Sequence, residues 1–246
     1  MRYTRNRIYI SGKQQLRLKE YRVLIAGCGI GSVIAECLLR IGVENITIID
    51  NDSVELSNLN RQNYLQEDIG KAKTDCLKKR LLQINPTARI VTHNLFLTSN
   101  NIAPLLQDHD AAVNALDFQS NAPFIFDALC QKNEIPVLHP YNIGWAGLLF
   151  VIMPGGPALT SIHDQFEGFE KNAVLFFLSK MDKQSEQRKW VEQVLTEYNN
   201  EIVQQSPPQL APGSWLLGGL CSTVLYRLAN NLQIKSFPDF YFLSAI

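Results

Sequence analysis

The chain has 246 residues, enough for one large α/β domain or two small ones, and its 46% hydrophobic and 19% charged residues are typical of a protein with a sizeable core. Lys plus Arg and Asp plus Glu both number 23, so no overall charge attracts nucleic acid or a membrane. No apolar run follows the basic amino terminus or approaches the roughly 18 residues of a membrane span. We therefore expect no signal peptide, no membrane contact, no nucleic-acid partner and a cytoplasmic location.

The first part of the chain alternates short apolar runs with segments of helical period. This alternation is typical of strand–helix–strand units in a parallel sheet. The expected elements are an arm with a short helix at 1–20, strands at 23–26, 46–49, 90–91 and 111–115, and helices at 34–41, 68–84, 101–107 and 121–133.

The pattern changes after residue 135. Strands are expected at 136–139 and 148–153, and the second of these should be antiparallel because no helix intervenes. A charged helical run at 180–200, an apolar helix at 210–231 and an aromatic strand at 237–243 follow.

These elements predict a Rossmann-like, doubly wound α/β fold with a mostly parallel sheet, an antiparallel extension and flanking helices. We expect a single domain, because the apolar pieces near the carboxy terminus need the sheet to bury them. Its expected parts are an arm and helix at 1–20, a nucleotide-binding core at 21–155, a polar, mobile inserted segment at 157–209, and a helix and strand at 210–246 that pack on the core.

The five cysteines, at positions 28, 37, 76, 130 and 221, are spread along the chain. No Cys-x-x-Cys pair occurs, and no third and fourth cysteine stand at the spacing of zinc ligands. We therefore expect no structural zinc, and most of the cysteines should behave as small core residues.

A glycine-rich turn follows the first strand and contains Gly27, Gly29 and Gly31. Glycines at this place let the backbone approach a phosphate and direct helix amides at it. The usual third glycine position holds Ser32, unless Gly31 fills that role in a loop one residue shorter. The turn predicts nucleotide binding, with a tight structural turn as the alternative.

Charged residues follow the second strand closely. Asp50 ends that strand, where a carboxylate accepts hydrogen bonds from a ribose, although a turn or helix-capping aspartate is the alternative. Arg61 and Lys73 come soon after, and these residue types hold a triphosphate better than a dinucleotide needs. Surface charges are the alternative for both. The combination favours ATP over NAD.

Asp117 closes the fourth strand and should face the same edge of the sheet. A carboxylate beside phosphates is favourable when a divalent cation lies between them, and Mg²⁺ takes one or two carboxylates plus phosphate oxygens. Asp117 is therefore a candidate magnesium ligand. The alternative is an N-cap for the helix that starts near residue 121.

Together these motifs resemble the ubiquitin-activating-enzyme-like adenylyltransferases, the ThiF/MoeB/HesA superfamily. The resemblance covers about residues 1–155, with a fainter echo over 208–228, and this chain resembles a zinc-free member. The matching motifs are Arg2-Tyr3-Thr4-Arg5, the turn at 27–32, the run from Asp50 to Gln62 with Ser57-Asn58-Leu59-Asn60-Arg61, Ile69-Gly70-x-x-Lys73, Ile84-Asn85-Pro86 and Asp117.

The resemblance implies a role for each matching residue. Asp50 would hold the ATP ribose, Asn58 and Arg61 would grip phosphates, Lys73 would neutralise charge as pyrophosphate leaves, Asp52 and the three glycines would complete the nucleotide site, and Asp117 would hold Mg²⁺. Arg5 would reach into the site of a neighbouring subunit, which implies a homodimer. The implied reaction is attack of a carboxylate on the α-phosphorus of ATP.

The sequence departs from some relatives in an informative way. Residues 157–209 contain no cysteine, so transfer to an internal cysteine as a thioester is not expected. The expected substrate is a carboxylate, namely the C-terminus of a small ubiquitin-like or sulfur-carrier protein or of a peptide. Tyr141 and Trp145 are candidates either for a groove that receives the substrate tail or for the core.

Three other functions are open. A relative within the same superfamily dehydrates a threonylcarbamoyl group on tRNA, but residues 160–210 show no concentration of basic residues for RNA. A non-catalytic ATP-binding partner subunit would not need the full set of charged residues. An oxidoreductase that binds NAD through Asp50 would leave Arg61, Lys73 and Asp117 unexplained.

Overall fold

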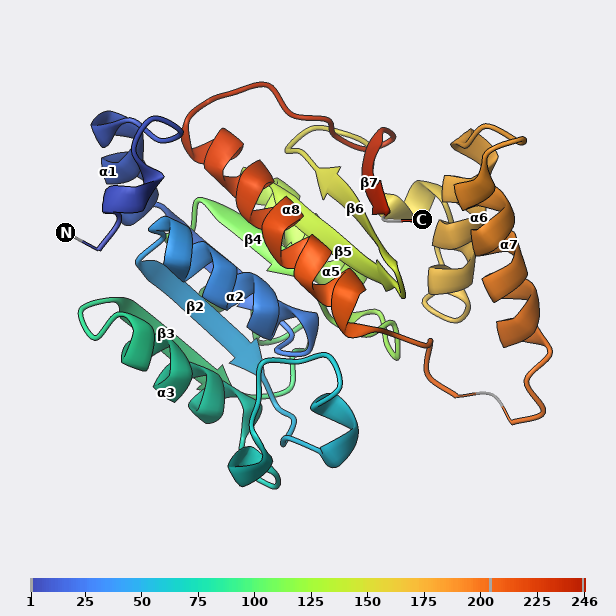
Figure 1. The fold of residues 1–246 in the computed structure, drawn as a ribbon, viewed down its shortest axis with the longest axis horizontal. Coiled ribbons are helices and arrows are strands. Elements are labelled where there is room, and N and C mark those ends of the chain that lie inside the picture. Colours follow the sequence, from blue (N-terminus) through green and yellow to red (C-terminus); the bar gives the residue numbers. More distant parts are fainter. Residues whose placement is uncertain (1, 204, 245) are drawn as a thin grey trace.

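In the computed structural model, which describes residues 2–203, 205–244 and 246, seven strands form one mixed sheet with helices on both faces (Figure 1). The strand order is β3-β2-β1-β4-β5-β6-β7, the first five strands being parallel and the last two antiparallel. The strands are β1 (Arg22–Ala26), β2 (Asn45–Asp50), β3 (Arg89–Asn94), β4 (Ala111–Asn114), β5 (Val137–Ile143), β6 (Ala146–Ile152) and β7 (Phe240–Ser244).

The sheet separates two apolar layers. On one face lie α1 (Gly12–Glu20), α2 (Ile30–Ile41), α3 (Lys73–Ile84) and α8 (Ala211–Ala229), and on the other lie α4 (Ile102–Leu105), α5 (Ala122–Lys132), α6 (Phe169–Lys180) and α7 (Glu186–Asn199). Both faces of β1 are covered, since Val23 and Ile25 point into the first layer and Leu24 and Ala26 into the second. None of the described helices has the length and apolarity that crossing a membrane requires.

The predicted fold class is confirmed, including its antiparallel extension. The β5–β6 hairpin turns at Gly144, which has a φ of +61°. The aromatic carboxy-terminal segment pairs with β6 as the edge strand β7. Its alternate side chains divide between the layers, with Tyr241 on the α8 side and Phe240 and Phe242 on the α6 side.

The predicted helix at 68–84 starts later than expected. Residues Gln66–Asp68 form a short 3-10 turn, and Gly70 has a φ of +82°, which a helix does not allow. The backbone then bridges back, with Gly70 donating to the Val54 carbonyl at 2.8 Å, so α3 begins at Lys73. Local pairing between 52–54 and 70–73 therefore overrides the helical spacing.

The predicted single helix at 180–200 is also wrong in its extent. The polar region 160–210 holds two helices, and the second, α7, begins at Glu186, where the Ser185 side chain accepts a hydrogen bond from the Arg188 amide. The first, α6, was missed because the segment is polar on average, yet Phe169 and Phe177 are fully buried beneath the sheet. Mobility of 157–209 stays a prediction.

Helix α8 runs along the sheet from the carboxyl ends of the parallel strands toward their amino ends. Its first turn contacts the β5–β6 hairpin at the carboxyl ends of the parallel strands, where Asn142 donates to the Ser214 hydroxyl at 2.9 Å. Its last turn lies near α1 at the opposite end. The chain crosses between the two layers just before Leu210, above the ends of the strands that carry the predicted site.

Two glycines of α8 provide a matched test of this packing. A β-carbon at Gly213 would lie 2.4 Å from Asn142 Oδ1 and 2.6 Å from the Gly144 carbonyl, whereas one at Gly219 would meet nothing within 4 Å. We expect Gly213→Ala to lower the free energy of unfolding by about 1–3 kcal/mol through overpacking. Gly219→Ala should raise it by up to about 1 kcal/mol, since alanine favours a helix. Urea denaturation of both variants measures this, and equal effects would contradict the packing.

Candidate active site

The carboxyl ends of three strands are tied together where the strand order reverses between β1 and β4. The Gly27 amide donates to the Ile49 carbonyl and the Ala115 amide to the Ala26 carbonyl, both at 2.8 Å. Gly27 has a φ of +93°, and a β-carbon there would lie 2.3 Å from the Ala115 carbonyl oxygen. Only glycine fits, and the crossing is the place where doubly wound sheets bind ligands.

The other two turn glycines have different surroundings. A β-carbon at Gly31 would lie 2.8 Å from the Ile25 side chain, so this glycine lets α2 pack closely on β1. Gly29 precedes α2 and faces the Gln62 amide, whose Oε1 is buried and has no hydrogen-bond partner among the described residues. An unsatisfied polar atom beside a helix N-terminus is a place for a polar ligand.

Asp50 anchors the glycine turn. One carboxylate oxygen accepts the Cys28 amide and the other accepts the Asp52 amide at 2.7 Å, and the residue is buried. The turn aspartate that the sequence left as an alternative is therefore present. Each oxygen keeps a further lone pair, so the predicted ribose contact stays a prediction for the same carboxylate.

Lys73 is buried and paired with Asp52. The two side chains are 2.8 Å apart and 8% and 56% exposed, and the Lys73 amide also donates to the Asp52 carbonyl at 2.9 Å. Lys73 is the first residue of α3, where the helix dipole disfavours a cation. Its ammonium is therefore held at an unfavourable place by one carboxylate, and a phosphate would be a second anion for it.

Arg61 is half-buried and contacts a segment far away in the sequence. Its Nε donates to Gln209 Oε1 at 2.7 Å, and its Nη1 donates to the Ser57 carbonyl at 2.9 Å. Burial lowers the pKa of Arg61, while the nearby Asp117 carboxylate raises it. Asn58 is buried and accepts the Glu55 amide at 3.0 Å, which shapes the loop that carries Arg61.

Asp117 keeps contact with solvent at the carboxyl ends of the strands, although protein atoms pack around its carboxylate. Desolvation by neighbouring protein raises its pKa, as do the carboxylates of Asp52 and Asp50, while Lys73 and Arg61 lower it. The structure thus brings together the five charged residues predicted for this site, namely Asp50, Asp52, Arg61, Lys73 and Asp117. No group of three or more His, Cys, Asp or Glu able to hold a metal occurs in the described part of the chain.

The loop that carries Asp117 depends on residues that the sequence did not reveal. Asn114 is buried and accepts the Leu116 amide, and its Nδ2 donates to Asp127 Oδ1 at 2.9 Å. His139 lies 2.8 Å from the same oxygen. Gln209, the partner of Arg61, was likewise not singled out. No local pattern marks such contacts, because they join different strands, helices and loops.

Arg5 is not at the site of its own chain. It lies exposed in a short turn beyond the amino ends of the strands, where the neighbouring Asn6 donates to the Ile41 carbonyl at 3.1 Å. The two aromatic residues differ as well. Tyr141 packs in the core with its hydroxyl buried and without a described partner, whereas Trp145 is 49% exposed on the β5–β6 turn.

Comparison with known proteins finds a family match over nearly the whole chain. The ThiF family model matches residues 3–245, well beyond the first 155 residues. The chain is 35% identical over 170 residues to the sulfur carrier protein ThiS adenylyltransferase of Bacillus subtilis, which covers 66% of this chain and 50% of that protein. It is 33% identical over 135 residues to the tRNA threonylcarbamoyladenosine dehydratase of Escherichia coli, covering 54% and 50%. The chain thus spans about half the length of these relatives.

Solved structures share the fold. Escherichia coli MccB with AMPCPP and MccA has a TM-score of 0.66 at 20% identity, and the match covers 94% of this chain and 65% of that one. The Escherichia coli tRNA N6-threonylcarbamoyladenosine dehydratase TcdA has a TM-score of 0.68 at 21% identity, with 94% of each chain covered. At these identities the likeness concerns the fold.

The pair of Lys73 and Asp52 yields a stability prediction. Asp52→Asn leaves a buried ammonium without its anion, so we expect a loss of about 1–3 kcal/mol in the free energy of unfolding, less than for a fully buried pair because Asp52 is partly solvated. Adding Lys73→Met should recover most of that loss. Urea denaturation of both variants measures the two values. A double variant no more stable than the single one would contradict the pairing.

Proposed function

The chain belongs to the ThiF family, and on that basis we propose that it is an adenylyltransferase that uses ATP to convert a carboxylate into an acyl-adenylate with release of pyrophosphate. The observation that carries this proposal is the convergence of Arg61, Lys73 and Asp117 beside the glycine turn, within mutual electrostatic range. A site for NAD would use Asp50 and the turn but would give these three residues no task.

In this proposal the turn and α2 place the nucleotide. The backbone amides at the start of α2 would face the phosphates, and Asp50 would accept from the ribose while it keeps the turn in place. Gln62, whose Oε1 lacks a described partner, would gain one from the ligand or its water. The nucleotide would then lie with its phosphates toward Arg61 and Lys73.

The two cations would act on the charge that moves during the reaction. Lys73 is held by Asp52 at 2.8 Å, so it is already positioned when ATP arrives. Arg61 is held by Gln209 and has its guanidinium partly desolvated, which strengthens its attraction for phosphate. Stabilising the negative charge of the departing pyrophosphate by fixed cations is the main contribution that a protein makes to phosphoryl chemistry.

Asp117 is the residue that would hold Mg²⁺, together with phosphate oxygens of the nucleotide. Its surroundings fit this role, because desolvation and the nearby carboxylates of Asp52 and Asp50 both raise the pKa of Asp117, and a bound cation would offset both effects. The ion would supply further neutralisation of phosphate charge. We propose no zinc, in keeping with the absence of paired cysteines in the sequence.

The second substrate would be a carboxylate, which already is a nucleophile and needs no general base. This accounts for a site of cations and amides without a serine or cysteine nucleophile. We propose the C-terminus of a small ubiquitin-like or sulfur-carrier protein or of a peptide. The name of the Bacillus subtilis relative, an adenylyltransferase of a sulfur carrier protein, supports this substrate class. Such a substrate suits a cytoplasmic protein, which we also propose.

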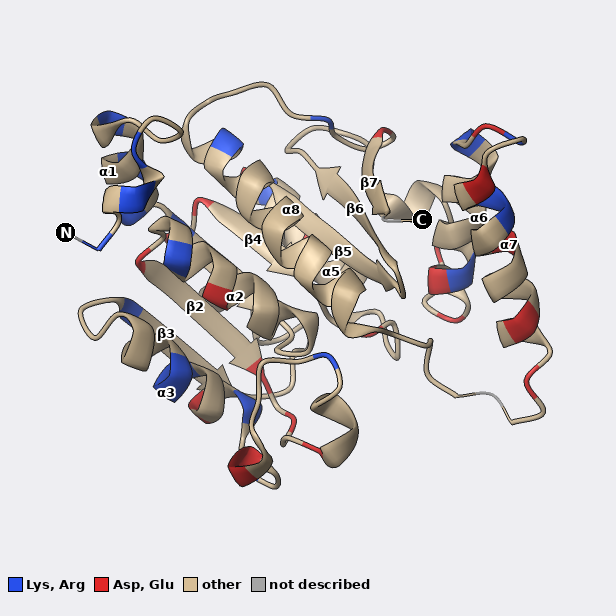
Figure 2. Ribbon diagram, in the orientation of Figure 1, with Lys and Arg blue, Asp and Glu red and all other residues tan. Residues whose placement is uncertain are grey.

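A tRNA threonylcarbamoyladenosine dehydratase is the second candidate, because TcdA and this chain each cover 94% of the other. The charge distribution favours it less. On α6 and α7 basic and acidic residues alternate (Figure 2), and Arg188 and Lys189 each pair with a glutamate of the same helix, at 2.7 and 2.9 Å. A helix pair of this kind offers no continuous basic surface for RNA.

We further propose a homodimer in which Arg5 completes the neighbouring site. Within one chain Arg5 lies at the end of the sheet opposite to Arg61 and Lys73. In a two-fold interface, residue i of one copy contacts residue j of the other and the reverse also holds. An interface patch that includes both the Arg5 arm and the site end of the sheet would therefore place Arg5 of each copy beside the site of its partner.

The first test of the function is ATP–pyrophosphate exchange with sulfur-carrier proteins, peptides and tRNA as candidate substrates. We expect Arg61→Ala, Lys73→Ala and Asp117→Asn each to lower the exchange rate by at least about 100-fold, as loss of a group that stabilises transition-state charge does. Lys79→Ala, an exposed lysine of the same helix as Lys73, is the control and should have little effect.

The same proteins distinguish the other candidate functions. ATP should raise the melting temperature of the native protein, since a ligand that binds only the folded state stabilises it. Stabilisation by NAD without an effect of ATP would support an oxidoreductase, and exchange that occurs only with tRNA would support the dehydratase. Binding of ATP without exchange for any substrate would indicate a non-catalytic partner subunit.

The shared site can be tested by mixing subunits. Arg5→Ala and Lys73→Ala should each be inactive alone. A mixed dimer would contain one complete site, so random mixing should restore about a quarter of the native exchange rate. Arg7→Ala, in the same arm, should be active by itself. No recovery on mixing, together with subunit exchange shown by mass spectrometry, would refute the arrangement.

A further inference from the structure

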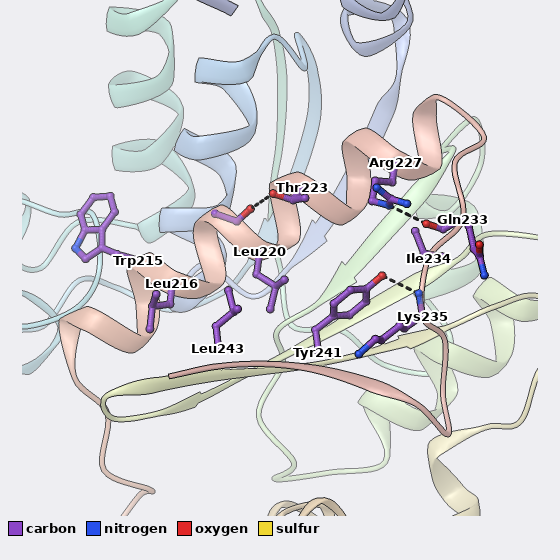
Figure 3. Close-up of a pocket in the computed structure, with 11 residues that line it drawn as sticks. Trp215, Leu216, Leu220, Thr223, Arg227, Gln233, Ile234, Lys235, Tyr241 and Leu243 are labelled. Atoms are coloured by element: carbon purple, nitrogen blue, oxygen red, sulfur yellow. Dashed lines mark hydrogen bonds between the residues drawn. The ribbon is translucent and has the colours of Figure 1, made fainter. Parts of the chain in front are cut away.

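A groove with a volume of about 750 Å³ lies between α8 and β7, and its lining includes none of the candidate site residues (Figure 3). It exists because α8 packs chiefly on β5 and β6 and less on the edge strand β7, whose Tyr241 and Leu243 side chains point toward the helix. Leu220 forms part of its apolar lining. Trp215 and Leu243, which lie toward one end, are 54% and 43% exposed.

The opposite end of the groove is basic. Arg227 donates to the Gln233 carbonyl at 2.7 Å, and the Lys235 ammonium lies 5.7 Å from the centre of the Tyr241 ring. The described lining contains no acidic residue. An apolar surface that ends in two cations without a lining carboxylate complements a segment that carries both apolar and acidic side chains.

Gly219 lies in the wall of this groove and has no packing reason to be glycine. A β-carbon there would meet nothing within 4 Å, in contrast to Gly218, where one would lie 3.1 Å from Val33. Glycine in the middle of an exposed helix is less stable than alanine. The flat helix surface at Gly219 therefore leaves room for close approach of another chain.

The groove also points to the candidate site. Leu243 pairs with Gly147, and Trp215 lies one turn into α8, so the apolar end is at the site edge of the sheet. Just before α8, Gln209 contacts Arg61. A polypeptide in the groove would thus have one end near the start of α8, close to the Gln209 that contacts Arg61. Its other end would lie beside Arg227 and Lys235.

We propose that this groove docks the polypeptide substrate, by an amphipathic segment whose apolar side chains lie along Leu220 and Leu243 and whose acidic side chains pair with Arg227 and Lys235. That the occupant is the substrate rests on the proposed function. That it carries apolar and acidic side chains is inferred from the residues that line the groove. A second copy of the chain is the competing occupant, and the oligomeric state of groove variants distinguishes it from a polypeptide substrate.

Two synthetic peptides of equal length, one alternating Leu with Glu and one alternating Leu with Lys, test the chemistry of the groove. We expect the Glu peptide to bind the native protein in fluorescence anisotropy and the Lys peptide not to bind. Trp215→Ala should weaken binding by at least about tenfold. Thr223 lines the groove and is exposed, so Thr223→Lys should tighten binding and Thr223→Glu weaken it, each by about twofold to fivefold.

Gly219→Leu separates docking from stability. The leucine side chain should fill the groove and weaken binding of the Glu peptide by at least about tenfold, while the melting temperature of the protein stays the same or rises. In the exchange assay it should raise KM for the polypeptide substrate and leave kcat and the KM for ATP unchanged. Lys13→Glu with Lys132→Glu, two exposed lysines away from the groove, is the matched control and should leave peptide binding unchanged.

Three results would overturn the assignment of the groove to an acidic, amphipathic segment. They are equal binding of both peptides or of neither, full binding by Gly219→Leu, and a change of the monomer–dimer equilibrium by groove variants in analytical ultracentrifugation, which would assign the groove to a second copy. If the native protein bound the Glu peptide but showed no ATP–pyrophosphate exchange with any candidate substrate, the proposed function would be refuted and the groove assignment would stand. Normal exchange by every groove variant, with KM unchanged, would refute substrate docking alone.

Discussion

The structure depends on the contact of Gly27 with Ala115, where the backbone of the first strand's turn touches the end of β4. No side chain fits between them, since a β-carbon would lie 2.3 Å from a carbonyl oxygen. The close approach fixes the spacing of three strand ends. It also lets Asp50, at the end of β2, accept a hydrogen bond from the Cys28 amide of the turn. The loop with Asp117, the start of α2 and the Asp50–Asp52 segment are all positioned by it.

Charged groups in this region are placed by contacts at several distances in the sequence. Asp52 holds Lys73 across 21 residues, and Gln209 holds Arg61 across 148. Both cations are partly desolvated and already engaged, so little reorganisation is needed when an anion replaces or joins their partners. The same crossing segment that carries Gln209 starts α8, which links the candidate site to the groove beside β7.

The sequence predicted the fold class and most elements, because apolar runs of period two and helical spacing are local signals. It failed where local spacing competed with pairing. Helical spacing at 68–72 gave way to a bridge between Ser53 and Ala72, and the polar average of 160–210 concealed α6, whose Phe169 and Phe177 are buried. The five charged residues expected beside the glycine turn were brought together, whereas Arg5 lies at the far end of the sheet. No role was expected for Gln209, Asn114 or Asp127.

The sequence by itself determined which chemical groups are available: a glycine turn after a buried strand, and acids and bases close behind it. Residue type and order along the chain are enough for this, because the ends of parallel strands meet at one edge. Only the tertiary structure decided which partners these groups contact. It made Asp50 an anchor, paired Lys73 with Asp52, and joined Arg61 to Gln209. It also opened the groove at Gly219, since contacts between distant segments follow from packing and leave no mark on local sequence.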